Sequence, residues 1–209
     1  MIQEDTEMRS AAKTMEKKKT YREELEKRFD SETCEKIWSR TISRLNSIYG
    51  KYDDLSEGVM SHTDSGIFPA AAMYITAKEF MSEEEAYQLI EDISVIICKK
   101  VQEPIAKMMK LPFMPSFFVK MWGPMTKKKF GSTCGFKNNF YPKEKGAFRM
   151  DILECPYSKY FTELGCPELT KIYCDNDLRI YGKLPGIAFE REGTLGRGAD
   201  KCDFYVRKV

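Results

Sequence analysis

The sequence predicts an α+β fold, in which an N-terminal helical layer packs on a small, mostly antiparallel β-sheet with short inserted helices. In several segments before residue 131, apolar side chains recur every three or four residues, a spacing typical of helices. After residue 131, glycine and asparagine become frequent and apolar residues alternate with polar ones, which is typical of strands. We expect residues 1–54 to form a helical extension and residues 55–209 to form a single α+β domain.

The balance of charges and the cysteine content limit the classes of protein to consider. The 209 residues include 34 Lys and Arg against 32 Asp and Glu, so the net charge gives no reason to expect nucleic acid as a partner. No apolar run approaches the roughly 20 residues that span a bilayer, so we expect no stable membrane insertion. An odd number of cysteines, seven, and a polar start without a secretory signal indicate a cytoplasmic protein with reduced thiols.

Two helices are predicted in the first part of the chain. Residues 8–29 are rich in Lys, Glu, Arg and Ala, which favour helix formation. Asp30 and Ser31 are suited to cap a second helix over 31–52. The apolar stripe of that helix includes Cys34, which we therefore assign to the core.

A third helix is predicted over 82–103. Ser82-Glu-Glu-Glu85 forms a capping box at its start, and Cys98 lies on its apolar part as a structural residue. Pro104 should kink or end this helix. We expect the helices over 31–52 and 82–103 to cover one face of the sheet.

The single histidine lies in a segment with the composition of a loop. Residues 50–66 carry Gly, Asp, Ser and Thr, and Ile67-Phe68-Pro69 then opens a further helix. A histidine in a polar loop is usually a surface residue. However, a pKa near neutrality and a place ahead of a helix N-terminus, where anions bind well, make His62 a candidate functional residue.

Residues 105–130 are dense in methionine and aromatic side chains and end close to Lys127-Lys-Lys129. Packing into the core is the interpretation we favour. A lid over an apolar pocket, a homodimer contact and a membrane-surface helix are the alternatives. Membrane attachment is the least expected of these, because the basic face consists of three lysines at one end.

The C-terminal part is predicted to contain strands and two short helices. The expected strands cover four ranges: 132–141, 146–153, 187–194 and 202–208. A Cys-Pro pair introduces each helix, at Cys155 and at Cys166. A cysteine at a helix N-terminus can be reactive, because free N–H groups and the helix dipole stabilise its thiolate. A buried corner residue is the simpler interpretation, and the spacing favours it.

Cysteines and aspartates gather between residues 148 and 205 without a recognised metal or nucleotide motif. Structural zinc sites usually contain a C-x-x-C pair, which is absent here, so we expect no cofactor. Zinc or an iron–sulfur centre stays open as an alternative, with Asp177 and Asp203 as further ligands. The run Gly193–Gly198 is neither a dinucleotide fingerprint nor a P-loop, and no serine triad is present. Arg197 and the amides of this run could hold a carboxylate.

Several longer motifs carry a resemblance to a known family. They are Ser61-His-Thr-Asp-Ser-Gly-Ile-Phe-Pro69, Leu111-Pro to Phe130-Gly131, Phe148-Arg-Met-Asp-Ile-Leu-Glu-Cys-Pro-Tyr157, Glu163-Leu-Gly-Cys-Pro-Glu-Leu169, Tyr173-Cys-Asp-Asn-Asp177, Phe189-Glu-Arg191 and Thr194-Leu-Gly-Arg-Gly-Ala-Asp-Lys-Cys-Asp-Phe204. From about residue 55 to the end, the chain resembles the L-2-amino-thiazoline-4-carboxylic acid hydrolase family.

The resemblance implies hydrolysis of a carbon–nitrogen bond in a cyclic amidine, with a thiazoline carboxylate as the small-molecule substrate. This chemistry needs a carboxylate anchor, a nucleophile and a proton donor. Arg149 is the expected anchor. The candidate nucleophiles or metal ligands are Cys155, Cys174 and Cys202, and the candidate acid–base groups are Asp177, Asp203 and His62. A non-catalytic small-ligand sensor and a cysteine-based metal-binding accessory protein are the alternatives.

Overall fold

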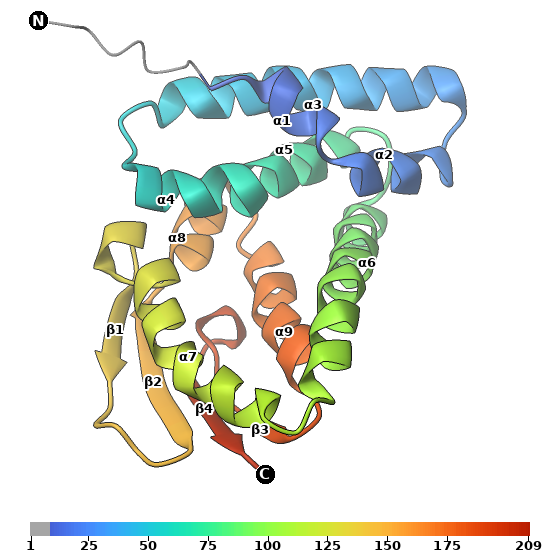
Figure 1. The fold of residues 1–209 in the computed structure, drawn as a ribbon. Helices are drawn as coiled ribbons and strands as arrows, with labels where there is room; N and C mark the ends of the chain where they lie inside the picture. The colour runs from blue at the N-terminus through green and yellow to red at the C-terminus, as the bar shows by residue number, and fades with distance from the viewer. Residues whose placement is uncertain (1–8) are drawn as a thin grey trace, which may run out of the picture.

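The computed structural model describes residues 9–209 as a mostly helical protein with a four-stranded antiparallel sheet in its C-terminal half (Figure 1). The α+β prediction is therefore confirmed. Residue 8 of the helix expected over 8–29, and the polar start of the chain, lie outside the described residues. The elements, in chain order, are α1 (Ala11–Glu16), α2 (Lys19–Glu26), α3 (Ser31–Lys51), α4 (Glu57–His62), the π-helix η1 (Thr63–Ile67), α5 (Phe68–Ala77), α6 (Glu83–Met109), α7 (Met114–Lys129), the 3-10 turn η2 (Ser132–Cys134), β1 (Lys137–Phe140), β2 (Ala147–Glu154), α8 (Pro156–Glu163), α9 (Leu169–Tyr181), β3 (Ile187–Glu190), the 3-10 turn η3 (Leu195–Arg197) and β4 (Cys202–Lys208).

Helices α1 to α5 lie together at one end of the molecule, with α3 alongside α5 (Figure 1). Asp30 caps α3 as predicted, because its carboxylate accepts a hydrogen bond of 2.9 Å from the Thr33 N–H. Cys34 is fully buried, which confirms its assignment to the core. Helix α5 is apolar on nearly all sides, and its buried residues join those of α3 in one cluster.

The segment expected to be a loop over 50–66 is largely helical. Helix α4 runs into η1, and η1 runs into α5 without an intervening turn. Small polar residues in this segment indicated a loop, but in the structure their side chains form hydrogen bonds to preceding helical carbonyls. The hydroxyls of Ser61 and Ser65 each donate to a main-chain oxygen at 2.6 Å. The loop prediction is wrong, and no free helix N-terminus follows His62.

Helix α6 begins at the predicted capping box, in which Ser82 and Glu85 each accept a hydrogen bond from the other's main-chain N–H. Pro104 does not end the helix, which continues to Met109. A proline removes one helical hydrogen bond and leaves the carbonyl four residues earlier without its donor. That carbonyl belongs to Lys100, an exposed residue, so water can replace the lost bond.

The strands lie in the order β1-β2-β4-β3, and each neighbouring pair is antiparallel. Alternation along the strands gives the sheet two different faces. Met150 and Phe204 are cross-strand partners that point into an apolar cluster. Arg149 and Tyr205 are the next pair along, so they lie on the opposite face. The sheet therefore has one face that packs into the apolar cluster and an opposite face that does not.

Helix α7 covers the apolar face of the sheet (Figure 1). Its Trp122 belongs to the same cluster as Phe204, and its Gly123 lies so close to Phe148 that a Cβ would be 3.1 Å from that ring. The expectation that the helices over 31–52 and 82–103 cover the sheet is wrong. Helix α3 packs on α5 and α6 packs on α9, because the denser apolar surface of α7 occupies the sheet.

Candidate functional site

Two cysteine side chains meet where the η3 turn lies against α9. The Leu195 N–H donates to Cys202 Sγ at 3.3 Å. A Cβ built on the next residue, Gly196, would lie 2.8 Å from Cys174 Sγ. The two sulfurs therefore contact consecutive residues of one turn, and each thiol affects the pKa of the other. Glycine is required at residue 196, because any side chain there would displace the sulfur of Cys174 or the α9 main chain.

The surroundings of Cys174 favour its thiolate. The hydrogen bond from the Cys202 thiol lowers the pKa of Cys174, against the opposing effect of burial, and the Thr194 hydroxyl, the Gly196 N–H and the positive charge of Arg191 lower it further. The Thr194 hydroxyl oxygen is fully buried and has no hydrogen-bond partner among the described residues, and it lies near enough to the Cys174 sulfur to lower the pKa of that thiol. The pKa of Cys202 is raised in turn, by the bond to Cys174 and by burial. One thiolate and one thiol thus share a proton.

Asp177 lies one turn after Cys174 on the same side of α9. The nearly fully buried Arg191 side chain donates to the Asp177 carboxylate at 3.2 Å and to the Cys174 carbonyl at 2.8 Å. A third of the Asp177 side chain remains exposed, but burial of the carboxyl raises its pKa to about 7. Arg191 opposes this shift, and the charges of Cys174 and Asp175 add to it. Asp177 can therefore hold or release a proton near neutral pH.

Cys155 is the third sulfur near this pair. It is the N-cap of α8, as the Cys-Pro motif predicts. Burial nevertheless raises the pKa of Cys155 to about 12. The N–H groups of Ser158 and Tyr157 offset this increase only in part, and the charge of Cys174 adds to it. Cys166 is fully buried, and burial raises its pKa to about 12 as well. Cys166 does not lie at a helix N-terminus, because α9 begins at Leu169 with Glu168 as its N-cap, and the N-terminus of α8 does not make Cys155 a thiolate.

His62 lies inside the protein and not in a polar loop. Its ring packs against Phe130, Phe136 and Tyr157. Nε2 is 2.7 Å from the Lys129 carbonyl, which can only accept, so Nε2 carries the proton and Nδ1 accepts from the Tyr157 hydroxyl at 3.3 Å. Burial lowers the pKa of His62, so the ring is neutral at pH 7. Tyr157 connects His62 to the group of Cys155, Cys174 and Cys202, which we call the sulfur cluster. The charges of Cys155 and Asp177 add to the effect of burial in raising the pKa of Tyr157.

Asp203 and Arg149 lie away from the sulfur cluster. The Asp203 carboxylate accepts from the main-chain N–H groups of Gly193 at 2.7 Å and Glu192 at 3.1 Å, so it holds the start of the turn in place. Burial alone would raise the pKa of Asp203, but these hydrogen bonds hold it below its ordinary value. Arg149 lies over the Tyr141 ring, 4.6 Å from its centre, on the sheet face that α7 does not cover.

Arg197 stands at the edge of the cluster. Its Nε and Nη2 atoms donate to the Asp175 carboxylate, with the shortest distance 2.7 Å. These bonds raise the pKa of Arg197, to which the nearby charge of Cys174 also contributes. Within residues 9–209, Nη1 of Arg197 has no protein partner, so a half-exposed pair of donors remains for an anion.

Three residues of this arrangement are absent from the candidates that the sequence suggests: Tyr157, Arg191 and Thr194. Each stands inside a motif that carries the family resemblance, and Arg191 follows a strand directly. Their positions in those motifs are the available signal. Nothing in the sequence shows that the Arg191 side chain is buried beside Cys174.

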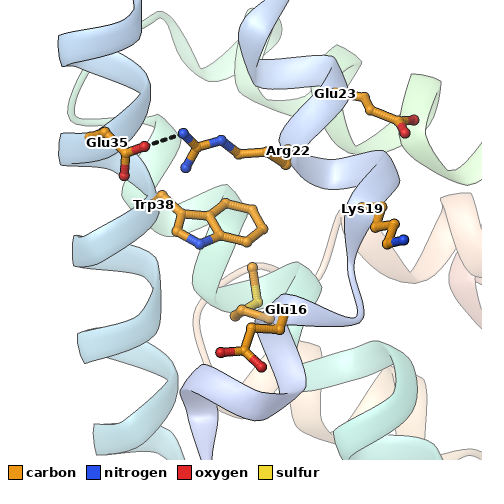
Figure 2. Close-up of a pocket in the computed structure, with 7 residues that line it drawn as sticks. Glu16, Lys19, Arg22, Glu23, Glu35 and Trp38 are labelled. Atoms are coloured by element: carbon orange, nitrogen blue, oxygen red, sulfur yellow. Dashed lines mark hydrogen bonds and ion pairs between the residues drawn. The ribbon is translucent and has the colours of Figure 1, made fainter.

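The described part of the chain contains no group of three or more His, Cys, Asp or Glu side chains arranged to hold a metal. Two surface hollows lie elsewhere. One, of about 450 Å³, lies between α2 and α3 and is lined by Arg22, Glu35 and Trp38 (Figure 2). The other, of about 440 Å³, lies between α6 and α9 and is lined by Cys98 and Leu178, among others. Neither includes the sulfurs of Cys174 and Cys202.

Comparison with known proteins identifies the family. The family model described as L-2-amino-thiazoline-4-carboxylic acid hydrolase matches residues 60–206, which include the whole sulfur cluster. No curated protein and no solved structure matched the chain. Because the match covers well over half of the 209 residues, the chain belongs to the L-2-amino-thiazoline-4-carboxylic acid hydrolase family.

Proposed function

We propose that this protein opens the ring of a 2-amino-thiazoline-4-carboxylate by hydrolysing the ring carbon–nitrogen bond, with Cys174 as the nucleophile. The observation that carries the proposal is the packing of the Cys174 sulfur under Gly196 of the η3 turn and beside Cys202, where its neighbours lower its pKa. Such surroundings stabilise a thiolate, which is the reactive form of cysteine. Family membership supports a hydrolase acting on such a ring.

The first half of the reaction forms a covalent bond to the protein. The substrate is an amidine that is protonated in neutral water, and its ring carbon carries the exocyclic amino group. The Cys174 thiolate attacks this carbon and the C=N π electrons move to nitrogen, which leaves a neutral tetrahedral adduct. Asp177 then gives its proton to the ring nitrogen, the C–N bond breaks, and the nitrogen departs as an amine. The remaining carbon is a cation bonded to the substrate sulfur, the amino group and Cys174.

Water completes the reaction. The Asp177 carboxylate removes a proton from water as the hydroxyl adds to the cationic carbon. The adduct then expels Cys174 as a thiolate and forms a thiocarbamate, and the released proton goes to the new amine. The net change is the addition of one water molecule, and both protein groups return to their starting forms. A pKa of about 7 suits Asp177 to act first as an acid and then as a base.

Arg197 is the proposed anchor for the substrate carboxylate. Its Nη1 donors stand at the edge of the cluster, whereas Arg149 lies on the other face of the sheet. The neutral thiols of Cys155 and Cys202 and the neutral His62–Tyr157 pair serve to position the site. Asp203 shapes the turn that carries Thr194 and Gly196.

Serine substitutions of single cysteines test this proposal, with turnover of 2-amino-thiazoline-4-carboxylate as the measurement. We expect Cys174→Ser to reduce kcat/KM by about three orders of magnitude or more, because a serine hydroxyl is a far weaker nucleophile without a base. Cys202→Ser should reduce it less. Cys34→Ser is the matched control, since this buried cysteine lies on α3 away from the cluster, and its activity should equal that of the wild type.

Two outcomes would contradict the proposal. Full turnover by Cys174→Ser would exclude the covalent route. Binding of the substrate without turnover by the wild-type protein would favour a small-ligand sensor.

A further inference from the structure

Helix α7 presents large apolar side chains on two opposite sides. Val119 and Trp122 on its inner side pack on the sheet, in agreement with the core packing expected for this stretch. On its outer side, Phe117 is 51% exposed, and Met121 and Met125 are exposed as well. The outer residues recur every four positions, so they form one stripe. A surface helix normally directs polar side chains outward, whereas α7 directs this apolar stripe outward as well.

The stripe continues into the end of α6 and the connection to α7, where Phe113 is 66% exposed. In Figure 1 this connection lies at the opposite end of the molecule from α1 to α3. We call the set of exposed residues the outer apolar face, and its members are Met108, Leu111, Phe113, Phe117, Met121 and Met125. Exposed apolar patches of this extent in soluble proteins usually mark an interaction site.

The charge around this face is of one sign. Between residues 104 and 143 the sequence contains eight lysines and no Asp, Glu or Arg, although the whole chain is nearly neutral. Six of these lysines flank the outer apolar face, at positions 107, 110, 120, 127, 128 and 129. None of the six forms an ion pair with an acidic residue of the described chain. The basic residues therefore include Lys107 and Lys110 at the end of α6 and Lys120 in the middle of α7, and are not restricted to the three lysines at the end of α7.

We propose that the outer apolar face adsorbs to an anionic lipid surface. Phenylalanine and methionine side chains enter the boundary between headgroups and acyl chains, and the flanking lysines contact the headgroups. Electrostatic attraction of the lysines to the anionic headgroups adds to the effect of burying the apolar side chains. Within residues 9–209 no helix has both the length and the apolar character needed to cross a bilayer, so the protein lies on the surface. This inference is independent of the proposed hydrolase activity.

The charge distribution selects a lipid surface over a second copy of the chain. A two-fold dimer through this face would bring the same patch of both copies together, and their lysines would repel each other. The apolar side chains of this face also protrude from the protein surface, and neither of the two hollows described above includes any of them. A fluid surface can adapt to such a protruding face without a preformed groove.

Vesicle co-sedimentation tests the proposal with the full chain. We expect the wild-type protein to sediment with vesicles of equal parts phosphatidylglycerol and phosphatidylcholine, and not with vesicles of phosphatidylcholine alone. Added salt should weaken the binding, because it screens the lysines. Phe113→Ser combined with Phe117→Ser should weaken it about tenfold or more, since two large apolar groups no longer enter the lipid. Both side chains are exposed, so the fold and the melting temperature should be unchanged.

Matched controls separate this face from the rest of the surface. Leu178→Ser removes an exposed apolar side chain on α9 and should bind vesicles like the wild type. Lys120→Gln with Lys128→Gln should weaken binding, whereas Lys17→Gln with Lys36→Gln, at exposed positions elsewhere, should weaken it less. Equal binding by the double phenylalanine variant, or no binding of the wild type to anionic vesicles, would overturn the proposal. Self-association that this variant abolishes, without vesicle binding, would assign the face to a dimer instead.

Discussion

Cys174 and Asp177 lie one turn apart on α9, and their surroundings move their pKa values in opposite directions. Hydrogen bonds from Cys202 and its neighbours lower the pKa of Cys174, while burial raises that of Asp177 to about 7. A thiolate and a protonated carboxyl can therefore exist side by side near neutral pH. This pairing of nucleophile and acid is what ring opening at a carbon–nitrogen bond requires.

The raised pKa of Asp177 predicts how stability depends on pH. The carboxyl loses its proton near pH 4 in the unfolded chain but near 7 in the folded protein. Between these values the folded state binds the additional proton, so this group stabilises the fold at low pH and its contribution is lost as the pH rises through about 7. Asp177→Asn removes the titration. Urea unfolding should show a smaller loss of stability from about pH 4 to pH 8 in this variant than in the wild type.

The same substitution has a second readout. Turnover by Asp177→Asn should fall by about two to four orders of magnitude, because an amide cannot supply the proton. An unchanged pH dependence of unfolding together with full turnover would show that this carboxyl is an ordinary surface group.

At the residue level, the sequence identifies the sulfur cluster better than its partners. Cys174, Cys202 and Asp177 are recognisable from their motifs, and the structure brings them together with Cys155. Alternation along a strand over 146–153 puts Arg149 and Met150 on opposite faces of the sheet, but only the position of α7 shows which face is covered. Arg191 could not be found, since a single arginine carries no sequence signal of its burial.

At the level of elements, the site depends on the contact between η3 and α9. Gly196 allows this contact, because a Cβ there would lie 2.8 Å from Cys174 Sγ and 3.0 Å from the Thr170 carbonyl carbon. Asp203 fixes the start of the same turn by accepting two main-chain hydrogen bonds. The glycine-rich run is therefore a close-packed support for a cysteine.

Gly196→Ala should disturb both the fold and the site. The added methyl group must displace the sulfur or the main chain of α9, and overpacking of this kind costs about 1–3 kcal/mol. Chemical denaturation measures the loss, and the activity should fall with it. Gly50→Ala is the matched control, because nothing lies within 4 Å of a Cβ at this helical position. It should raise the stability by about 0.5–1 kcal/mol. Equal stability of the two variants would show that the turn does not pack tightly on α9.

The helical content around His62 shows where local composition misleads. Ser, Thr, Asp and Gly indicate a loop, but hydroxyl groups that bond to preceding carbonyls are compatible with a helix. The low helix propensity of these residues is outweighed by burial of Ile67 and Phe68 in the apolar cluster that also contains the buried residues of α3 and α5. Tertiary packing of this kind cannot be read from the composition of a seventeen-residue window.

At the scale of the whole molecule, two apolar clusters hold the protein together. One joins α1 to α6 with α8 and α9, and the other joins α7 to the sheet. Helix α3 lies before the family match at residues 60–206, yet its buried side chains belong to the first cluster. The division at residue 54 remains a prediction, and α3 contributes to the core on which α8 and α9 rest.

Leu45→Ala tests that contribution. Leu45 is fully buried in the first cluster, so its truncation should lower the free energy of unfolding by about 2–5 kcal/mol. Ile97→Ala, at a position on α6 that is 39% exposed, should change it by less than about 0.5 kcal/mol. If both variants had the same free energy of unfolding as the wild type, α3 would be an appendage without a role in the core.

The overall architecture follows from the sequence more readily than the packing of its layers. Periodicity distinguishes helices from strands, and it predicts the α+β class and all four strands. It does not say which helix covers the sheet, because α3, α6 and α7 each offer an apolar side. The choice depends on close fits such as that of Gly123 against Phe148, which only the folded chain reveals.

Acid quenching of the wild-type protein during turnover tests the central claim most directly. Mass spectrometry of the digested protein should show the opened substrate bonded to the peptide that contains Cys174, because the proposed route passes through this adduct. The adduct should be absent from Cys174→Ser, and Cys34→Ser should form it like the wild type. Sustained turnover of 2-amino-thiazoline-4-carboxylate by Cys174→Ser, with no adduct on any cysteine of the wild type, would contradict the account.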